Sequence, residues 1–309
     1  MNQTTLSAEQ ARVLAKGPFP DYPFTPKSFV HPNGLTQSYL DEGEGDPVLM
    51  LHGNPSWSYY WRHLVLGLRD DYRCIVPDHI GMGLSDKPDD KDYSYTLRSR
   101  IQDLDRLLTQ LDVGDNLTLA VHDWGGMIGF GWALKHGARI KRLVILNTAA
   151  FPLPSSKPLP WQLKLGRDYN LGALAIRGFN AFAAGATRQG VVRKMAPDVQ
   201  QAYEAPYDSW KNRISTLRFV QDIPLAPGDR AWDLVEEAGK RLASFADRPA
   251  YLGWGLQDFV FDHHFLKGFE DALPRAEKQV YEDAGHYVLE DKHELLVPRI
   301  RDFLDRNLL

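Results

Sequence analysis

Residues 117–135 carry the stretch LTLAVHDWGGMIGFGWALK, in which an aspartate separates two apolar segments. Residues 117–121 predict a buried strand, and residues 127–135 predict the helix that follows it. Gly125 and Gly126 are the small residues that a tight strand-to-helix turn requires. The carboxylate of Asp123 would lie exposed at the tip of this turn, where neighbouring N–H groups would keep it ionised. The plainer alternative is that Asp123 only caps the helix.

Short apolar runs continue this pattern on both sides of the turn. Candidate strands are residues 36–40, 48–51, 74–76, 117–121, 143–146, 250–253 and 278–281. Most are continuously apolar, as expected for strands that are covered on both faces. Helical spacing in residues 97–108 and a closing apolar segment at 295–304 predict helices. The alternation predicts an α/β fold with a mainly parallel sheet flanked by helices.

The alternation stops between residues 151 and 229. Boundary signals at its two ends are Pro152, Pro154, Pro158, Pro160, Pro224, Pro227 and Gly228. The helix-prone pieces between them are rich in aromatic residues, namely Trp161, Phe179, Phe182, Tyr203, Trp210 and Phe219. We therefore expect a core formed by residues 1–150 and 230–309, with residues 151–229 as a helical cap over the active site.

A nucleophilic carboxylate needs a base and a group that orients the base. His286 follows the strand at 278–281, and Asp258 lies just past the strand at 250–253. The order nucleophile, acid, histidine is the one expected when strands of this type carry a catalytic triad. Asn147 occupies the other usual place for the acid, but an amide cannot stabilise an imidazolium by charge. Three competing carboxylates are more easily explained as solvated: Asp262, Asp283 and Glu290.

Two loops near the expected site add further groups. The sequence His52-Gly53-Asn54-Pro55 follows the strand at 48–51, where a backbone N–H of an oxyanion hole is expected. The two donors would then be the backbone N–H groups of Asn54 and Trp124. The loop DHIGMGLS at residues 78–85 follows the next strand, and it fits either a turn near the site or a purely structural one.

Together these motifs resemble the haloalkane dehalogenases of the α/β-hydrolase fold, from about Phe29 to Leu304. The resemblance implies a mostly parallel central sheet with a helical cap inserted between core strands. It also implies Asp123 as nucleophile, His286 as base and Asp258 as acid. The Asn54 side-chain amide and the Trp124 indole N–H would bind the leaving halide, as in the subgroup with this triad and donor pair.

The mechanism implied by this resemblance has two halves. Asp123 displaces halide from carbon and forms an alkyl ester, while Asn54 and Trp124 donate to the departing anion. A neutral His286 then takes a proton from water, which hydrolyses the ester to an alcohol. No metal and no organic cofactor has a role. The partners would be a small apolar substrate, water and halide, and the apolar cap could either line the pocket or bury a second copy in a homo-oligomer.

The chain also resembles the β-lactone decarboxylases of bacterial long-chain olefin biosynthesis, which share this fold and site arrangement. The stretches at residues 146–151, 218–224 and 254–262 carry that likeness. Donors that hold a halide could equally hold the carboxylate released from a strained lactone. Motifs do not separate the two activities, although a long dialkyl lactone requires an extended apolar tunnel.

Two further classes compete with these. Epoxide hydrolases also use an aspartate at this turn, and they need cap tyrosines such as Tyr169, Tyr203 or Tyr207. Asn54, however, stands where those enzymes generally have an aromatic residue. A non-catalytic binding protein could reuse the fold. Such a protein usually lacks one catalytic residue, and none is visibly missing here.

Composition bounds the remaining classes. The chain has 309 residues, 43% of them hydrophobic, with 36 basic against 40 acidic residues and no block of like charges. This balance suggests neither nucleic acid nor an anionic membrane as a partner. Cys74 is the only cysteine and is expected in the core, so no intrachain disulfide forms. Residues 1–16 lack the apolar stretch of a signal peptide, and no run could span a bilayer, so we expect a soluble, cytoplasmic protein.

Overall fold

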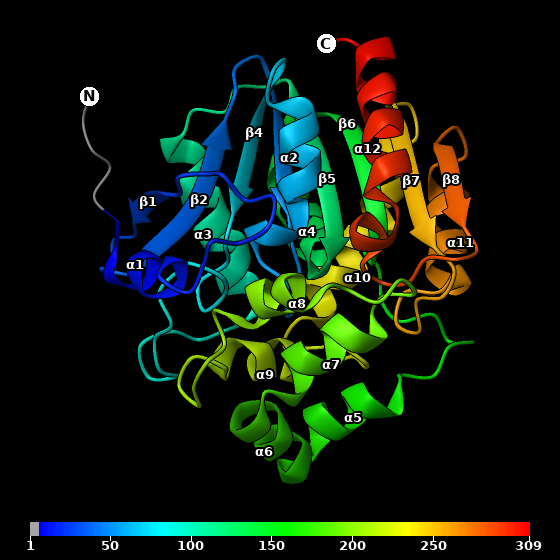
Figure 1. Cartoon of the computed structure of the whole chain (residues 1–309). Coiled ribbons are helices and arrows are strands. Elements are labelled where there is room, and N and C mark those ends of the chain that lie inside the picture. Colours follow the sequence, from blue (N-terminus) through cyan, green and yellow to red (C-terminus); the bar gives the residue numbers. More distant parts are fainter. Residues whose placement is uncertain (1–5) are drawn as a thin grey trace.

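A computed structural model describes residues 6–309 and shows one eight-stranded sheet with helices on both faces (Figure 1). Residues 1–5, which belong to the segment expected to lack a signal peptide, lie outside the described residues. The strands are β1 (Lys27–Val30), β2 (Thr36–Glu42), β3 (Asp46–Leu51), β4 (Tyr72–Pro77), β5 (Leu117–Asp123), β6 (Ile140–Thr148), β7 (Ala250–Gly255) and β8 (Glu277–Tyr281).

The helices cover the two faces of the sheet and one of its edges. They are α1 (Ala8–Leu14), α2 (Arg62–Leu68), α3 (Leu97–Gln110), α4 (Trp124–His136), α5 (Trp161–Asp168), α6 (Asn170–Phe179), α7 (Ala181–Gln189), α8 (Pro197–Glu204), α9 (Ile214–Gln221), α10 (Trp232–Arg241), α11 (His263–Ala272) and α12 (Val288–Arg306). Three short 3-10 helices join them at Ser58–Trp61, Gly137–Arg139 and Leu242–Phe245.

The strand order is β1-β2-β4-β3-β5-β6-β7-β8, and β3 to β8 run parallel to one another. Only β1 and β2 are antiparallel to their neighbours. β5 lies in the middle and all seven of its residues are buried. The carboxyl ends of β3, β5, β6 and β7 therefore meet at one edge of the sheet, which is where an α/β protein places its ligand site.

All seven strands expected from sequence are confirmed, each within two or three residues of its predicted bounds. The expected helices at residues 97–108 and 295–304 are also confirmed, as α3 and as the last part of α12. The sequence did not predict β1, because its four residues alternate little and none of them is buried. Cys74 is fully buried in β4, as expected for a packing residue.

Two apolar layers fill the space between sheet and helices. One joins the sheet to α3, α4, α10 and α11, and the other joins it to α1, α2 and α12. Burial of this many aliphatic and aromatic side chains is the dominant stabilising contribution to such a fold. These two layers hold the ends of the strands in place.

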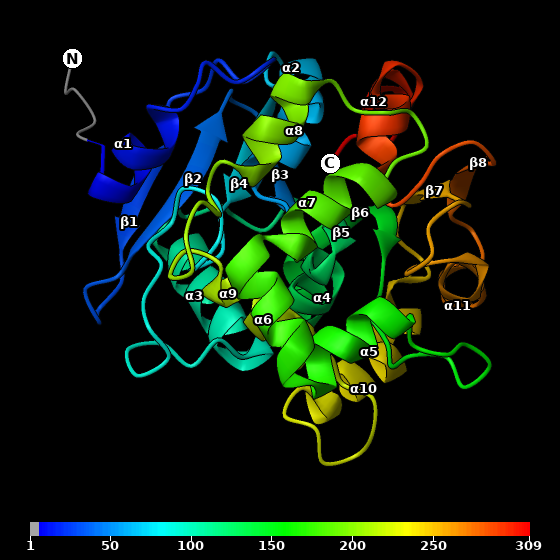
Figure 2. The same cartoon turned by 60° about the horizontal axis from the view of Figure 1, so that its bottom comes forward.

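Helices α5 to α9 lie beyond the carboxyl ends of the parallel strands, and α7, α8 and α9 each add buried side chains to these layers (Figures 1 and 2). They come from the segment that the sequence predicts as a cap, between β6 and α10. Among residues 6–309, no helix is both long and apolar enough to cross a membrane.

Candidate active site

The chain turns sharply at Asp123, between β5 and α4. Asp123 has φ 51° and ψ −128°, a conformation that non-glycine residues rarely adopt. The turn also needs close backbone packing, since a Cβ on Gly125 would lie 2.0 Å from the carbonyl oxygen of Leu51. The Asp123 side chain accepts no hydrogen bond from the first turn of α4. Asp123 thus occupies the N-cap position of α4 without capping it through its side chain, and its carboxylate makes other contacts.

The Asp123 carboxylate lies between Asn54 and His286. Its Oδ1 accepts a hydrogen bond from the backbone N–H of Asn54 at 2.6 Å. Its Oδ2 is 3.4 Å from Nε2 of His286. Gly53 makes this approach feasible, because a Cβ there would overlap the Asp123 carboxylate at 1.8 Å. The side chain is buried and borders a cavity.

The three residues predicted as a triad lie together. Nδ1 of His286 is 2.8 Å from Oδ2 of Asp258, and both side chains are buried. The backbone N–H of Val260 donates to Oδ1 of Asp258 at 2.7 Å. The side chains of Asp258, His286 and Asp123 thus follow one another in contact. This is the geometry required to orient an imidazole beside a nucleophile.

Asn147 holds the acid in place, a role that sequence reasoning missed. Its Nδ2 donates to Oδ2 of Asp258 and to the carbonyl oxygen of Gly255, both at 3.0 Å. Its Oδ1 accepts from the backbone N–H of Gly255 at 2.8 Å. One signal in the sequence could have indicated this role. Asn147 occupies a usual position of the triad acid, and an amide there can donate to the Asp258 carboxylate, whereas an ionised acid could not.

Electrostatics at His286 differ from the expectation of a neutral imidazole. Burial lowers the pKa of His286, but the negative charges of Asp258 and Asp123 outweigh it and raise this pKa to about 10. In the free protein at neutral pH, the imidazole therefore carries a proton. An ester on Asp123 would remove one of the two negative charges that raise this pKa.

Of the competing carboxylates, Glu290 contradicts the sequence prediction. Its side chain is buried rather than solvated, and it pairs with Arg62 and accepts from Tyr203 at 2.5 Å. Asp283 is exposed and pairs with Lys292, as expected. Asp262 is partly buried and pairs with Lys157 at 2.6 Å. None of the three is hydrogen-bonded to His286, so the choice of Asp258 as its partner agrees with the geometry.

The loop that carries His286, here called the histidine loop, is also held by Asp291, which the sequence did not indicate. Its carboxylate accepts from the backbone N–H of Gly285 at 2.8 Å and from those of Val192 and Arg193. The backbone N–H of Tyr287 donates to the carbonyl oxygen of Gly190. The segment that carries His286 is thus tied directly to the chain that leaves α7.

The two predicted leaving-anion donors both border the cavity. The Trp124 indole Nε1 has no hydrogen-bond partner within residues 6–309, and its ring packs edge-on against Phe219 of α9. Nδ2 of Asn54 donates to the carbonyl oxygen of Thr216, also in α9, at 3.0 Å. One N–H of this amide is therefore occupied by α9, which leaves the other for an anion.

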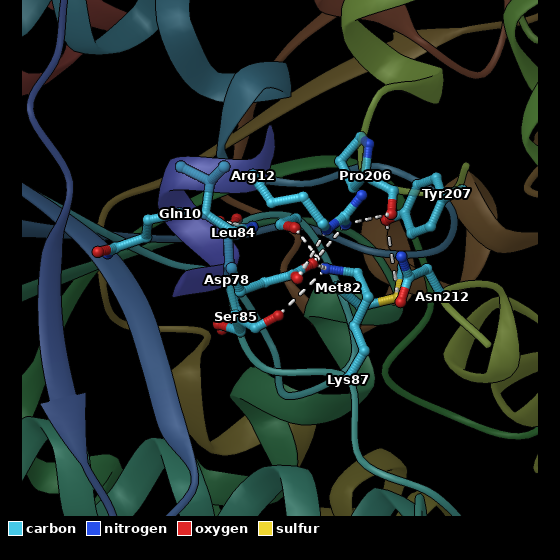
Figure 3. Close-up of polar contacts among 12 residues, drawn as sticks. Gln10, Arg12, Asp78, Met82, Leu84, Ser85, Lys87, Pro206, Tyr207 and Asn212 are labelled. Atoms are coloured by element: carbon cyan, nitrogen blue, oxygen red, sulfur yellow. Dashed lines mark hydrogen bonds and ion pairs between the residues drawn. The ribbon is translucent and has the colours of Figure 1, made fainter. Parts of the chain in front are cut away.

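The loop at residues 78–85 is structural (Figure 3). The buried carboxylate of Asp78 accepts from the backbone N–H groups of Ser58 at 2.6 Å and Leu84 at 2.8 Å. Gly83 has φ 49°, and a Cβ there would overlap that carboxylate. Tyr207 reaches the same loop, since its hydroxyl donates to Sδ of Met82 at 3.7 Å. The loop therefore braces the strand ends without entering the cavity.

The cavity above Asp123 has a volume of about 300 Å³. Its polar end is formed by Asn54, Asp123 and His286, and the rest of its wall is mostly apolar. Helices α5, α6, α7 and α9 supply much of that wall, for example Leu163, Ile176, Phe182, Gly185 and Val220. Such a site suits a hydrophobic molecule that presents one reactive centre to the carboxylate.

No tyrosine borders this cavity among the described residues 6–309. Tyr169 is exposed, Tyr203 is hydrogen-bonded to Glu290, and Tyr207 to the loop at Met82. The cap tyrosines that epoxide hydrolysis would need are therefore engaged elsewhere or point outward. A group of possible metal ligands, Asp262, His263 and His264, lies at the start of α11, where Asp262 already binds Lys157.

Residues 46–293 match the protein family described as alpha/beta hydrolase fold. A cis-3-alkyl-4-alkyloxetan-2-one decarboxylase from Xanthomonas campestris pv. campestris is 63% identical over 298 residues, which cover 94% of this chain and 99% of that protein. A haloalkane dehalogenase from Mycolicibacterium smegmatis is 34% identical over 224 residues, covering 69% and 70%. The solved structure of the haloalkane dehalogenase DatA from Agrobacterium tumefaciens C58 is similar with a TM-score of 0.82 at 25% identity, covering 92% of this chain and 97% of that one.

Proposed function

We propose, from the premise that this chain belongs to the alpha/beta hydrolase family, that it converts cis-3,4-dialkyl β-lactones into alkenes and carbon dioxide. An oxetan-2-one is a β-lactone, so the proposal follows the printed activity of the relative that is 63% identical over nearly its whole length. That similarity carries the proposal. It favours the alternative that the sequence left open over haloalkane dehalogenation, for which the similar protein is 34% identical.

In the first step, Asp123 attacks C4 of the lactone, the saturated carbon bonded to the ring oxygen. The C4–O bond breaks, an ester forms between Asp123 and C4, and the ring oxygen becomes part of a carboxylate on C3. The indole N–H of Trp124 and the free amide N–H of Asn54 would donate to this new anion. The backbone N–H of Asn54, which already holds Oδ1 of Asp123, fixes the carboxylate for attack.

In the second step, the bond between C3 and the carboxylate carbon breaks. Its electron pair forms the C3–C4 double bond, and Asp123 departs from C4 as a carboxylate. Carbon dioxide and an alkene are released, and no water is consumed. A protonated His286 next to Asp123 would favour this step, because a cation stabilises the departing carboxylate.

The same proton would suppress hydrolysis of the ester. An imidazolium cannot accept a proton from water, so His286 acts as a base only after its pKa has fallen. When halide leaves, the anion can diffuse away. In the lactone reaction the new carboxylate stays attached to the substrate, and with Asp258 it keeps negative charge close to His286. This favours fragmentation over hydrolysis.

The second candidate function is haloalkane dehalogenation, favoured by one specific observation. Asn54 and Trp124 both border the cavity next to Asp123, with an N–H available on each. These donors suit a halide as well as a carboxylate. The two candidates differ in whether water attacks the ester on Asp123.

Isotope labelling of Asp123 separates them. The protein is incubated with either a cis-3,4-dialkyl β-lactone or 1-bromobutane in water enriched in oxygen-18, and the peptide containing Asp123 is weighed by mass spectrometry. We expect alkene and carbon dioxide from the lactone with no label in Asp123. Incorporation of oxygen-18 into Asp123 during lactone turnover, with a hydroxy acid as product, would overturn the proposed decarboxylation. Bromide release with label in Asp123 would support dehalogenation as a second activity.

A further inference from the structure

Helices α5 and α6 and the loop before α9 expose large apolar side chains. Trp161, Leu171 and Phe179 are 71%, 70% and 78% exposed, and Leu174 and Trp210 are about half exposed. Leu174 and Trp210 adjoin, because both approach the position where Gly178 would carry a Cβ. We call these five residues the apolar outer face. Exposed aromatic and aliphatic groups that gather in this way mark an interaction surface more often than isolated ones do.

The same part of the chain is strongly basic. Residues 151–195 contain seven Lys or Arg against one Asp, a net charge of +6. The rest of the chain has 29 basic against 39 acidic residues. The nearly even total therefore combines one short basic segment with an acidic remainder. Arg167 and Arg193 pair with acidic residues, whereas Lys164, Arg177 and Arg188 have no ion-pair partner among residues 6–309. The Arg177 guanidinium donates to the carbonyl oxygen of Trp210. The sequence expectation that charge suggests no anionic membrane holds for the whole-chain sum but not for this segment.

The arrangement of these groups is that of a surface-bound amphipathic segment. The Arg177 guanidinium lies 4.5 Å from the ring centre of Trp210, so a cation lies directly beside an exposed aromatic ring. Trp, Phe and Leu on one face with Lys and Arg around them are the residues that bind a bilayer at its headgroup level. Figure 2 shows α5 and α6 in front of the rest of the molecule, with no other element covering them.

The apolar outer face also adjoins the cavity. Trp161 belongs to both, since it is exposed and yet borders the cavity together with Leu163 and Leu165 of α5. α6 lines the cavity through Gly172, Ala175 and Ile176. Phe179 continues this row at the exposed end of α6, whereas Leu174 lies on the other side of the helix. Trp161 thus connects the exposed surface of α5 with the cavity that Asp123 borders.

We propose that the apolar outer face docks on an anionic lipid bilayer, from which the cavity takes its substrate. The docking step stands on exposure and charge alone, whereas uptake of substrate from the bilayer rests on the proposed function. Trp161, Leu171 and Phe179 would enter the headgroup region, and Lys164, Arg177 and Arg188 would bind the lipid phosphates. Such binding is peripheral, because no helix of residues 6–309 is long and apolar enough to cross a bilayer.

The test measures cosedimentation of the full chain with vesicles. We expect binding to vesicles of equimolar phosphatidylcholine and phosphatidylglycerol, weaker binding at high salt, and little binding to phosphatidylcholine alone. The double variant Leu171→Ser with Phe179→Ser should weaken binding about tenfold, and Lys164→Glu with Arg188→Glu by a similar factor. None of these four residues carries a proposed catalytic role.

A matched control removes exposed apolar groups elsewhere. Val30 in β1 and Leu295 in α12 are 62% and 54% exposed, and Val30→Ser with Leu295→Ser should leave vesicle binding unchanged. Equal binding by the control and the Leu171→Ser, Phe179→Ser variant would overturn the proposal. So would absence of vesicle binding together with a self-association, seen by analytical ultracentrifugation, that this variant abolishes, because the face would then contact protein.

Activity is measured separately with a short-chain lactone dissolved in buffer. Vesicle binding without any alkene formation supports docking and counts only against the proposed function. Alkene formation by a protein that binds no vesicles counts only against docking. Circular dichroism of each variant shows whether the fold is retained, and the charge-reversal pair serves as the second variant if the apolar pair does not fold.

Discussion

The carboxyl ends of the strands line the cavity with polar side chains, whereas α5, α6, α7 and α9 line it with mainly apolar ones. The strand ends contribute Asp123, Asp258 and His286, each fixed by short hydrogen bonds and buried packing. The helices contribute mainly apolar walls whose residues touch the reactive groups at few points, such as Thr216 with Asn54. The strand ends determine what chemistry is feasible, and the helices determine which molecule reaches it.

The largest expected effect tests the strand ends. Asp123→Asn should lower kcat for alkene formation by about ten-thousand-fold, because an amide is a very poor nucleophile. The matched control is Asp283→Asn, which changes an exposed carboxylate near the same histidine loop and should retain wild-type kcat. Gas chromatography of the alkene provides the rate. Activity within tenfold of wild type in Asp123→Asn would remove this residue from the mechanism.

A second test concerns the proton on His286. Its pKa is raised to about 10 in the folded protein, compared with about 6.5 when unfolded. The stabilisation from this proton is therefore fully present below about pH 6.5 and is lost as the pH rises through 10. We expect the free energy of unfolding of the wild type to fall by roughly 2–4 kcal/mol over that interval, relative to His286→Gln.

Urea denaturation at several pH values measures this difference. Both proteins share every other titrating group, so the variant itself serves as the reference. Parallel curves for the wild type and His286→Gln between pH 6.5 and 10 would show that the imidazole is not held as a cation by Asp123 and Asp258.

The strand ends could be predicted from sequence because each catalytic group follows an apolar run. Asp123, Asp258 and His286 were assigned in this way, and the strands that carry them are confirmed. Residues whose roles depend on three-dimensional partners were not found. Glu290 looks like a solvated acid in the sequence, and only the fold brings Arg62 beside it. Asp291 reaches Gly285 and the chain after α7 for the same reason.

The orientation of the helices that line the cavity was harder to predict from sequence. Their segment was expected as a cap from prolines and aromatics, and that division of the chain remains a prediction. Sequence could not say which aromatic residues would line the cavity. Phe182 in α7 borders it, whereas Phe179, three residues earlier at the end of α6, is exposed. Such a difference depends on the packing angle of a helix rather than on residue type.

A smaller effect is expected for Asn147, which acts on the strand ends without reacting. Asn147→Ala removes the donor to Oδ2 of Asp258 and should lower kcat roughly ten- to hundredfold with little change in KM. If it acts through Asp258, the double variant with Asp258→Asn should be little worse than Asp258→Asn alone. Additive losses in this double-mutant cycle would instead indicate a separate role, such as holding the end of β7 through Gly255.

The smallest expected effect tests the helices. Gly185 of α7 borders the cavity, and a Cβ there meets no atom within 4 Å, so a larger side chain has room to enter. Gly185→Phe should lower kcat/KM about tenfold for a long-chain lactone and much less for a short-chain one, because the ring would occupy the space of distant methylene groups. Gly185→Ala is the matched control. It should leave chain-length preference unchanged and stabilise α7 by up to about 1 kcal/mol. An equal loss of kcat/KM for both lactones in Gly185→Phe would mean that α7 supports the carboxylate end of the site. In that case the helices would affect the chemistry as well as the choice of substrate.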